Sequence, residues 1–189
     1  MIFQGIIFDL DGVICSTDEY HYQAWKELAD REGIPFDRSV NNRLRGVSRM
    51  ESLEILLERA KRSYSQEEKE KMAAAKNTRY QELLREMTPA DLSPEVFETL
   101  ETLRKQGLKL AIGSSSKNTP LILDRLGLGG YFDAVSDGNN ITRSKPDPEV
   151  FLKAAEYLAK PAEQCLVVED AVVGVEAAHA AGMQAAAIG

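Results

Sequence analysis

The sequence predicts an α/β protein, with a Rossmann-like core built on a parallel sheet and a helical cap domain inserted after the first strand. Three observations support this fold class. A nearly continuous apolar run at residues 2–8 is typical of a strand covered on both faces. Residues 17–87 then place apolar side chains at helical spacing. From residue 94 onward strands and helices alternate, which indicates a parallel sheet with helices on both faces.

The first predicted strand, Ile2–Phe8, ends where the sequence becomes polar. Asp9, Asp11 and Gly12 follow it directly, and neither aspartate nor glycine favours a strand. This strand therefore leads two carboxylates to one end of the predicted sheet.

The cap, predicted for residues 16–88, consists of consecutive helices. Ser65 and Glu68 have the spacing of a capping box, which predicts a long helix running toward Met87. The proline-bracketed segment 88–94 suits a hinge, and the core then comprises residues 1–15 and 89–189. Two apolar stripes have helical spacing, the first at Ala24, Trp25, Leu28 and Ala29 and the second at Met50, Leu53, Leu56 and Leu57.

The second part of the core alternates regularly between helix and strand. Turn signals such as Gly107 and Gly182 stand between a helix and the strand that follows it. Helices are predicted at residues 94–106, 119–126, 149–158 and 172–181, and strands at residues 108–112, 132–135, 165–168 and 184–188.

Composition and charge exclude several classes of protein. The chain of 189 residues carries 30 acidic and 23 basic side chains, and a net charge of −7 disfavours nucleic acid as a partner. Cys15 and Cys165 match no zinc or redox spacing, so we expect two buried thiols. We expect no signal peptide, because no basic segment or small-residue cleavage site precedes the first strand, and no apolar stretch is long enough to span a bilayer. We therefore expect a cytoplasmic monomer with no membrane or nucleic-acid partner.

Polar residues follow four of the predicted strands at the end where a parallel sheet binds ligands. Two residues apart in extended chain, Asp9 and Asp11 would direct their carboxylates to the same side. Glu169 and Asp170, which follow a neighbouring strand, add further negative charge. Carboxylates this close require a cation, and Mg²⁺ is the usual ion where phosphate also binds. An isolated Asp-x-Asp-Gly more often ends a strand in a turn, but the other polar strand ends favour a site.

The remaining strand ends supply groups that bind anions. Residues 114–118, Ser-Ser-Ser-Lys-Asn, lie between a strand and a helix start, where backbone N–H groups bind phosphate, although serines there also cap helices. Lys145 lies in a Lys-Pro-Asp-Pro turn and could neutralise a transferring phosphoryl group, whereas a lone lysine is usually a solvated surface charge. Phosphoryl transfer needs little beyond positioning and charge neutralisation, so Asp9 can attack while Asp11 acts as acid and base.

At these residues the sequence resembles the haloacid dehalogenase superfamily, whose signature is Asp-x-Asp-Gly, then Ser, then Lys, then an acidic pair. Within the superfamily the chain resembles the β-phosphoglucomutase family, and the cap carries the more specific similarity. The matching segments are residues 17–25 (TDEYHYQAW), 44–49 (LRGVSR), 51–53 (ESL), 76–77 (KN), 88–91 (TPAD) and 114–118 (SSSKN).

The resemblance implies a role for each matched residue. Asp9 would become the aspartyl phosphate, and Asp11 would move protons to and from the sugar oxygens. The metal ligands would be Asp9, the backbone carbonyl of Asp11, Glu169 and Asp170, and Ser114 with Lys145 would bind the transferring phosphoryl group. The residues implied in substrate binding are His21, Arg45, Gly46, Val47, Ser52 and Lys76 for the sugar, Arg49, Ser116, Lys117 and Asn118 for the second phosphate, and also Ser115.

Two features depart from the family pattern. Arg45 stands where the family usually has lysine, and a planar guanidinium forms hydrogen bonds that an ammonium does not. The sequence ends at Gly189, directly after the last predicted strand, where family members carry a further segment that ends in a helix.

Three functions are consistent with these residues. The first, implied by the resemblance, is a mutase that interconverts β-glucose 1-phosphate and glucose 6-phosphate through glucose 1,6-bisphosphate. The second is a sugar-phosphate phosphatase, in which water attacks the phosphorylated Asp9. The third is a non-catalytic receiver-like module, which also pairs carboxylates, Mg²⁺ and a lysine but has no helical insertion after its first strand.

Overall fold

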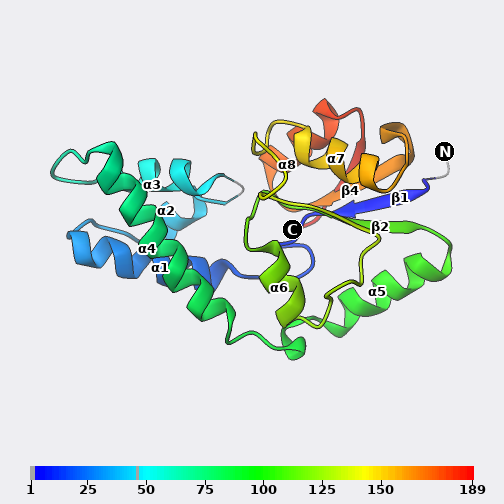
Figure 1. Cartoon of the computed structure of the whole chain (residues 1–189), viewed down its shortest axis with the longest axis horizontal. Coiled ribbons are helices and arrows are strands. Elements are labelled where there is room, and N and C mark those ends of the chain that lie inside the picture. The colour runs from blue at the N-terminus through cyan, green and yellow to red at the C-terminus, as the bar shows by residue number, and fades with distance from the viewer. Residues whose placement is uncertain (1–2, 46) are drawn as a thin grey trace. The chain divides into compact units, whose positions relative to one another are not determined.

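A computed structural model of the protein describes residues 3–45 and 47–189. Gly46, which the resemblance assigns to sugar binding, lies outside the described residues. The chain divides into two compact units, Met1–Ser16 with Met87–Gly189 and Thr17–Glu86, which are described separately below (Figure 1).

The first unit is built on a five-stranded parallel sheet, as the sequence predicts. Its strands are β1 (Gly5–Phe8), β2 (Lys109–Gly113), β3 (Ala134–Ser136), β4 (Cys165–Glu169) and β5 (Gln184–Ala187), in the order β3-β2-β1-β4-β5. All four residues of β1 are buried because β1 lies at the centre of the sheet and is covered on both faces. The chain leaves β1 toward β2 on one side and later reaches β4 on the other, so the strand order reverses at β1. Ligands bind at such a point in open parallel sheets.

Helices cover both faces of this sheet. Helices α7 (Glu149–Tyr157) and α8 (Val172–Ala180) lie on one face, and α5 (Pro94–Lys105) and α6 (Thr119–Arg125) on the other (Figure 1). Phe151 and Ala177, from α7 and α8, belong to the same buried cluster as Ile7 of β1 and Val167 of β4. Two short 3₁₀ helices, Pro89–Asp91 and Ala162–Gln164, lie in the connections.

The described part of the second unit contains helices and no strand, in agreement with the sequence. Its helices are α1 (Asp18–Glu32), α2 (Arg38–Asn42), α3 (Arg49–Leu57) and α4 (Gln66–Leu84). Both predicted apolar stripes contribute to one core cluster, which includes Trp25 and Leu53. Ser65 caps α4 through the predicted capping box, since its hydroxyl accepts from Glu68 N and the Glu68 carboxylate accepts from Ser65 N. None of the helices among the described residues is long and apolar enough to cross a membrane.

Several element boundaries differ from the sequence prediction by one to three residues, including those of β1, α4 and β3. Helix α4 ends at Leu84 rather than continuing to Met87, and Met87 is buried in the first unit, where its carbonyl accepts a hydrogen bond from Arg125 Nε at 2.8 Å. Strand β3 begins at Ala134 rather than Phe132, because its ladder with β2 starts where Ala134 pairs with Ala111.

Candidate active site

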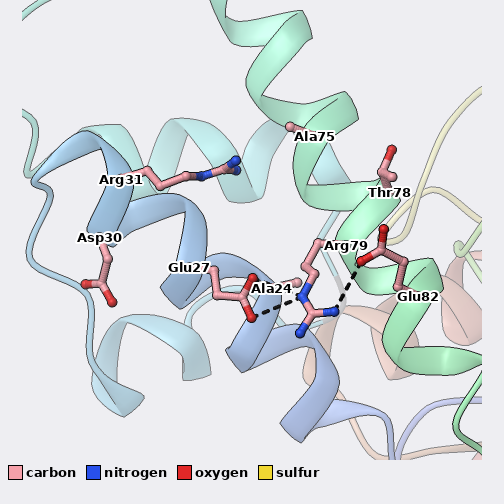
Figure 2. Close-up of a pocket in the computed structure, with 8 residues that line it drawn as sticks. All are labelled: Ala24, Glu27, Asp30, Arg31, Ala75, Thr78, Arg79 and Glu82. Atoms are coloured by element: carbon pink, nitrogen blue, oxygen red, sulfur yellow. Dashed lines mark hydrogen bonds and ion pairs between the residues drawn. The ribbon is translucent and has the colours of Figure 1, made fainter.

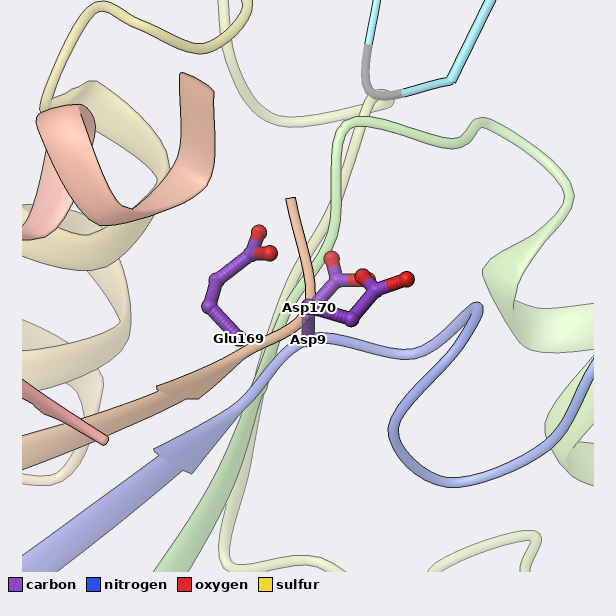
Figure 3. A group of neighbouring side chains, drawn as sticks. All are labelled: Asp9, Glu169 and Asp170. Carbon is purple, nitrogen blue, oxygen red and sulfur yellow. The ribbon is translucent and has the colours of Figure 1, made fainter. Parts of the chain in front are cut away.

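Three carboxylates meet at the ends of the two central strands β1 and β4. Asp9 follows β1 directly, Glu169 is the last residue of β4, and Asp170 comes next (Figure 3). Each offers an oxygen that lies within 4.8 Å of the oxygens of the other two. The parallel pairing of Phe8 with Val168 sets this arrangement, because it aligns the residues that follow each strand.

Lys145 lies between two of these carboxylates. Its Nζ is 2.6 Å from Asp9 Oδ1 and 2.5 Å from Glu169 Oε1, and the ammonium lies 4.7 Å from the centre of the Phe151 ring. The lysine is 5% exposed, so it is not a solvated surface charge. Burial lowers the pKa of Lys145, but the charges of Asp9 and Glu169 outweigh this effect and hold the pKa above its ordinary value.

Burial raises the pKa of Asp9 from 3.8 to about 7. Lys145 opposes the increase, whereas the negative charges of Glu169 and Asp11 add to it. At neutral pH the Asp9 carboxyl therefore titrates, and an additional positive charge beside it would keep it ionised. A buried carboxyl group whose pKa is raised this far, although it pairs with Lys145, is a feature of functional sites more than of structural ion pairs.

Two glycines leave room for the carboxylates. A Cβ at Gly174, in α8, would lie 1.8 Å from Glu169 Oε1, and a Cβ at Gly12 would lie 2.1 Å from Asp170 Oδ2. Gly12 also has φ +96°, a conformation that disfavours other residues. The Glu169 carboxylate is fixed further by Ala171 N, which donates to Oε2 at 2.7 Å. The glycine of the Asp-x-Asp-Gly motif is thus explained by the side chain of Asp170.

Asp11 differs from the expectation drawn from strand geometry. Strand β1 ends at Phe8, residue 10 lies in a bend, and Asp11 forms an isolated bridge with Cys15, so Asp9 and Asp11 do not belong to one extended strand. The Asp11 carboxylate is not part of the three-carboxylate group. Asp11 is nevertheless close enough to raise the pKa of Asp9.

The segment after β2 forms a series of tight turns. Ser116 N donates to Ser114 Oγ at 3.2 Å, and Asn118 N donates to Ser116 Oγ at 3.1 Å. Two N–H groups that were predicted to bind an anion therefore donate to serine hydroxyls in this structure. Ser114 and Asn118 are buried, Ser115 is half-buried, and Lys117 is exposed.

The helical unit contains a second polar cluster. Lys76 Nζ, in α4, lies 2.8 Å from His21 Nδ1, in α1, and Lys76 is 3% exposed. The rings of His21 and Tyr80 lie 4.0 Å apart between centroids, and Tyr80 Oη shares a 2.8 Å hydrogen bond with Thr17 Oγ1. Burial, followed by the charges of Lys76 and Arg49, lowers the pKa of His21 well below its ordinary value. The imidazole is therefore neutral at physiological pH.

Arg45 binds a carboxylate of its own unit. Its Nε and Nη2 donate to Asp18 Oδ1 and Oδ2 at 3.3 and 3.1 Å, and Asn41 Nδ2 donates to Asp18 Oδ1 at 3.1 Å. A lysine could not form this forked contact. The other predicted residues of the helical unit are Val47 and Arg49, which are half-buried, and Ser52, which is buried in α3.

A groove of about 610 Å³ lies between α1 and α4 of the helical unit (Figure 2). Within it Arg79 pairs with Glu27 at 2.9 Å and with Glu82 at 3.1 Å. No predicted site residue within the described chain lines this groove. Three of its five charged residues pair with one another, and it is not the candidate active site.

Sequence reasoning missed several residues that shape the two clusters. Gly12 leaves room for Asp170, which is far from it in sequence, and Gly174 leaves room for Glu169, which lies before the turn that leads into α8. The periodicity of the sequence does not indicate such contacts. Asp18 and Asn41 hold Arg45, and Tyr80 lies against His21. The four-residue spacing of Lys76 and Tyr80 could have indicated that Tyr80 belongs to this cluster, because residues four apart lie on the same face of a helix.

Comparison with known proteins identifies the family. A sequence model of haloacid dehalogenase-like hydrolases matches residues 3–182. The chain belongs to the haloacid dehalogenase-like hydrolase family. The predicted resemblance and fold class are confirmed. As a member of this family the chain is an enzyme of the phosphotransferase type. This excludes the alternative of a non-catalytic receiver-like module.

Members of the haloacid dehalogenase-like family that resemble the chain include mutases and phosphatases. β-Phosphoglucomutase of Bacillus subtilis is 43% identical over 98% of this chain and 83% of its own length. Phosphorylated carbohydrates phosphatase of Thermotoga maritima is 34% identical over 96% of this chain and 82% of its own length. The crystal structure of β-phosphoglucomutase from Clostridium difficile superposes with a TM-score of 0.92, at 40% identity over 100% of this chain and 85% of that one.

Proposed function

We propose that the enzyme interconverts β-D-glucose 1-phosphate and glucose 6-phosphate through a glucose 1,6-bisphosphate intermediate, with Asp9 as the nucleophile. The observation that carries the proposal is the contact between the buried Asp9 carboxylate and Lys145 at the end of the central strand. The 43% identity to a β-phosphoglucomutase over nearly the whole chain supports this choice of reaction.

Asp9 would attack the phosphorus of a bound phosphate ester in line with the leaving oxygen. A bond forms between an Asp9 carboxylate oxygen and phosphorus, and the bond from phosphorus to the sugar oxygen breaks with its electron pair remaining on that oxygen. The Asp11 carboxyl would give its proton to the leaving oxygen and take one from the sugar hydroxyl that attacks in the reverse transfer. The Lys145 ammonium, 2.6 Å from Asp9, would offset the charge that spreads over the phosphoryl oxygens.

The residues present fit a magnesium ion. Asp9, Glu169 and Asp170 offer only carboxylate oxygens, the donors that a hard divalent cation prefers, and these oxygens lie within 4.8 Å of one another. Asp9, Glu169, Asp170 and the backbone carbonyl of Asp11 would hold the ion. When bound, Mg²⁺ supplies positive charge that offsets the negative charge of the phosphoryl oxygens. The same charge would lower the pKa of Asp9, which burial raises.

The mutase also needs groups that bind the sugar and the phosphate that is not being transferred. In the sheet-containing unit Ser114 would bind the transferring phosphoryl group. The residues that would bind the second phosphate are Ser116, Lys117 and Asn118, and Ser115 would contribute to substrate binding. In the helical unit the cationic Arg49, whose pKa burial lowers, would bind the second phosphate. His21, Arg45, Gly46, Val47, Ser52 and Lys76 would bind the sugar. A neutral His21 beside a buried Lys76 offers hydrogen bonds to hydroxyl groups.

A second candidate function is a sugar-phosphate phosphatase. Two relatives favour it: the Thermotoga maritima protein named above and fructose-1-phosphate phosphatase YqaB of Escherichia coli, which is 30% identical over 97% of this chain. In a phosphatase water replaces the sugar hydroxyl and attacks the phosphorus of phosphorylated Asp9. The same residues of the sheet-containing unit would serve both reactions.

Phosphorus NMR distinguishes the two functions. The enzyme is incubated with β-glucose 1-phosphate, Mg²⁺ and a catalytic amount of glucose 1,6-bisphosphate. The mutase converts the substrate signal into that of glucose 6-phosphate, whereas a phosphatase yields inorganic phosphate. Accumulation of inorganic phosphate without glucose 6-phosphate would refute the mutase, and Asp9→Asn serves as the inactive control.

A further inference from the structure

The segment that carries Lys145 is closed by a single carboxylate. Glu149, the first residue of α7, turns its side chain back along the chain. Its Oε2 accepts hydrogen bonds from Thr142 N at 3.0 Å, Thr142 Oγ1 at 2.9 Å and Arg143 N at 2.8 Å. The two ends of residues 142–149 are thereby joined through one oxygen atom.

Further contacts fix the backbone inside this closed segment. Asp147 N donates to Ser144 O at 3.0 Å, and Glu149 N donates to Asp147 Oδ1 at 3.0 Å. Lys145 N faces Ser115 Oγ at 3.5 Å, which lies in the segment after β2. The backbone of Lys145 is therefore set by contacts on both sides of it.

The carboxylate of Glu149 is strongly held in its charged form. A hydrogen bond from Lys153, followed by those from the Arg143 and Thr142 N–H groups, lowers the pKa of Glu149 to about 2. Hydrogen bonds to an ionised acceptor are shorter and stronger than neutral ones. The closure of the segment is thus maintained across the physiological pH range.

The ammonium of Lys145 depends on this backbone for its position. Its Nζ lies 2.6 Å from Asp9 Oδ1 and 2.5 Å from Glu169 Oε1, so a small displacement of the backbone would lengthen both contacts. We propose that Glu149 is a positioning residue for phosphoryl transfer, whose carboxylate closes residues 142–149 and thereby holds the Lys145 ammonium against Asp9. This inference rests on the proposed function of Asp9 and Lys145.

A purely structural role for Glu149 predicts a different outcome. An acidic residue in the first turn of a helix stabilises that helix through its dipole. If this were the only role of Glu149, its removal would lower the stability of the protein without a specific effect on the phosphoryl transfer that uses Lys145. The test must therefore separate kcat from KM and include a background that lacks the Lys145 ammonium.

Four variants make the test specific. Glu149→Ala removes the closure, and Glu149→Gln retains an oxygen that can accept the same hydrogen bonds. Thr142→Val removes only the hydroxyl donor. Glu156→Ala is the matched control, because it removes an exposed carboxylate from the same helix α7 and leaves residues 142–149 unchanged.

Steady-state kinetics are measured with β-glucose 1-phosphate and with p-nitrophenyl phosphate. We expect Glu149→Ala to lower kcat about tenfold on each ester that the enzyme turns over, with KM changed less than about twofold, since small misplacements of catalytic groups are costly. Glu149→Gln recovers most of this loss, Thr142→Val lowers kcat about twofold to threefold, and Glu156→Ala matches the wild type. In a Lys145→Met background, Glu149→Ala has no further effect on kcat.

Two results would overturn the inference. One is a folded Glu149→Ala variant with the kcat of the wild type. The other is the same fractional loss of kcat with and without Lys145. If Glu149→Ala does not fold, Thr142→Val becomes the deciding variant, and a kcat equal to that of the wild type overturns the inference.

Failure of the proposed function gives a different pattern. Turnover of p-nitrophenyl phosphate without isomerisation of the sugar phosphate refutes the mutase. The kcat values of the Glu149 variants on p-nitrophenyl phosphate then still test the positioning role of Glu149. If neither ester is turned over, the affinity for beryllofluoride with Mg²⁺, a phosphoryl mimic that binds aspartate, is measured by fluorine NMR. We then expect Glu149→Ala to weaken binding about tenfold, and equal affinity would overturn the inference.

Discussion

Gly174 lies against the carboxylate of Glu169, and a Cβ at residue 174 would come within 1.8 Å of Glu169 Oε1. Gly174→Ala should therefore displace this carboxylate from Asp9 and Lys145. We expect about a tenfold rise in the Mg²⁺ concentration needed for half-maximal activity, because residues that orient metal ligands have effects of this size. The exposed Glu176, in the same helix, provides the control Glu176→Ala. A Gly174→Ala enzyme with unchanged Mg²⁺ dependence would contradict the proposed role of Glu169.

Asp9 should make the metal-free enzyme less stable as pH rises. Its pKa is about 7 in the folded state, against an ordinary value of 3.8, so the folded state binds more protons between these values. The free energy of unfolding should consequently fall as pH increases from about 4 to about 7. Asp9→Asn removes this contribution, so the variant should gain stability relative to the wild type across the same interval. Denaturant unfolding in EDTA measures the difference, and a difference independent of pH would contradict the raised pKa of the Asp9 carboxyl.

His21 should remain neutral where an ordinary histidine begins to bind a proton. Burial and the charge of Lys76 lower its pKa well below 6.5, so only the unfolded state gains a proton as pH falls through that value. Stability conferred by the buried neutral imidazole is then lost as pH falls. The imidazole signals of His21 in a proton NMR titration should show no protonation near pH 6.5, and Lys76→Met should raise the pKa of His21. An ordinary titration in the wild type would contradict the contact between Lys76 and His21.

Tyr80 and Thr17 should be energetically coupled. Their side-chain oxygens lie 2.8 Å apart, and both residues are buried. Tyr80→Phe leaves the Thr17 hydroxyl without this partner and should cost about 1–2 kcal/mol of unfolding free energy. Adding Thr17→Val to Tyr80→Phe should cost less than Thr17→Val alone, because one change already breaks the bond. Additive losses in this double-mutant cycle would show that the hydrogen bond contributes nothing.

Much of the fold could be predicted from the sequence because its strands and helices have distinct patterns. The apolar residues of β1 end at charged residues, and the alternation after residue 94 can form only a covered parallel sheet. The boundaries were harder to predict, as Met87 shows. Its apolar side chain continues the helical pattern of α4, yet its burial and its carbonyl contact with Arg125 belong to the sheet-containing unit.

The candidate site was only partly predictable. Asp9 and Glu169 could be grouped because each stands at a strand end, and parallel strands bring such ends together. Lys145 could be added because its loop follows β3 at the same edge of the sheet. The position of Asp11 could not be predicted, because the turn after Phe8 replaces the extended geometry assumed for it. Contacts such as Glu149 with Thr142 depend on how one loop folds back on itself, and residue spacing does not reveal them.

The most direct test of the central claim is to locate the transferred phosphoryl group. The enzyme is mixed with glucose 1,6-bisphosphate and Mg²⁺, quenched during turnover, and treated with borohydride, which reduces an aspartyl phosphate but not a free carboxylate. Mass spectrometry of the N-terminal peptides should place the reduced residue at Asp9, and Asp9→Asn should show no reduction there. Turnover that leaves Asp9 unreduced, or reduction at another carboxylate, would contradict the account.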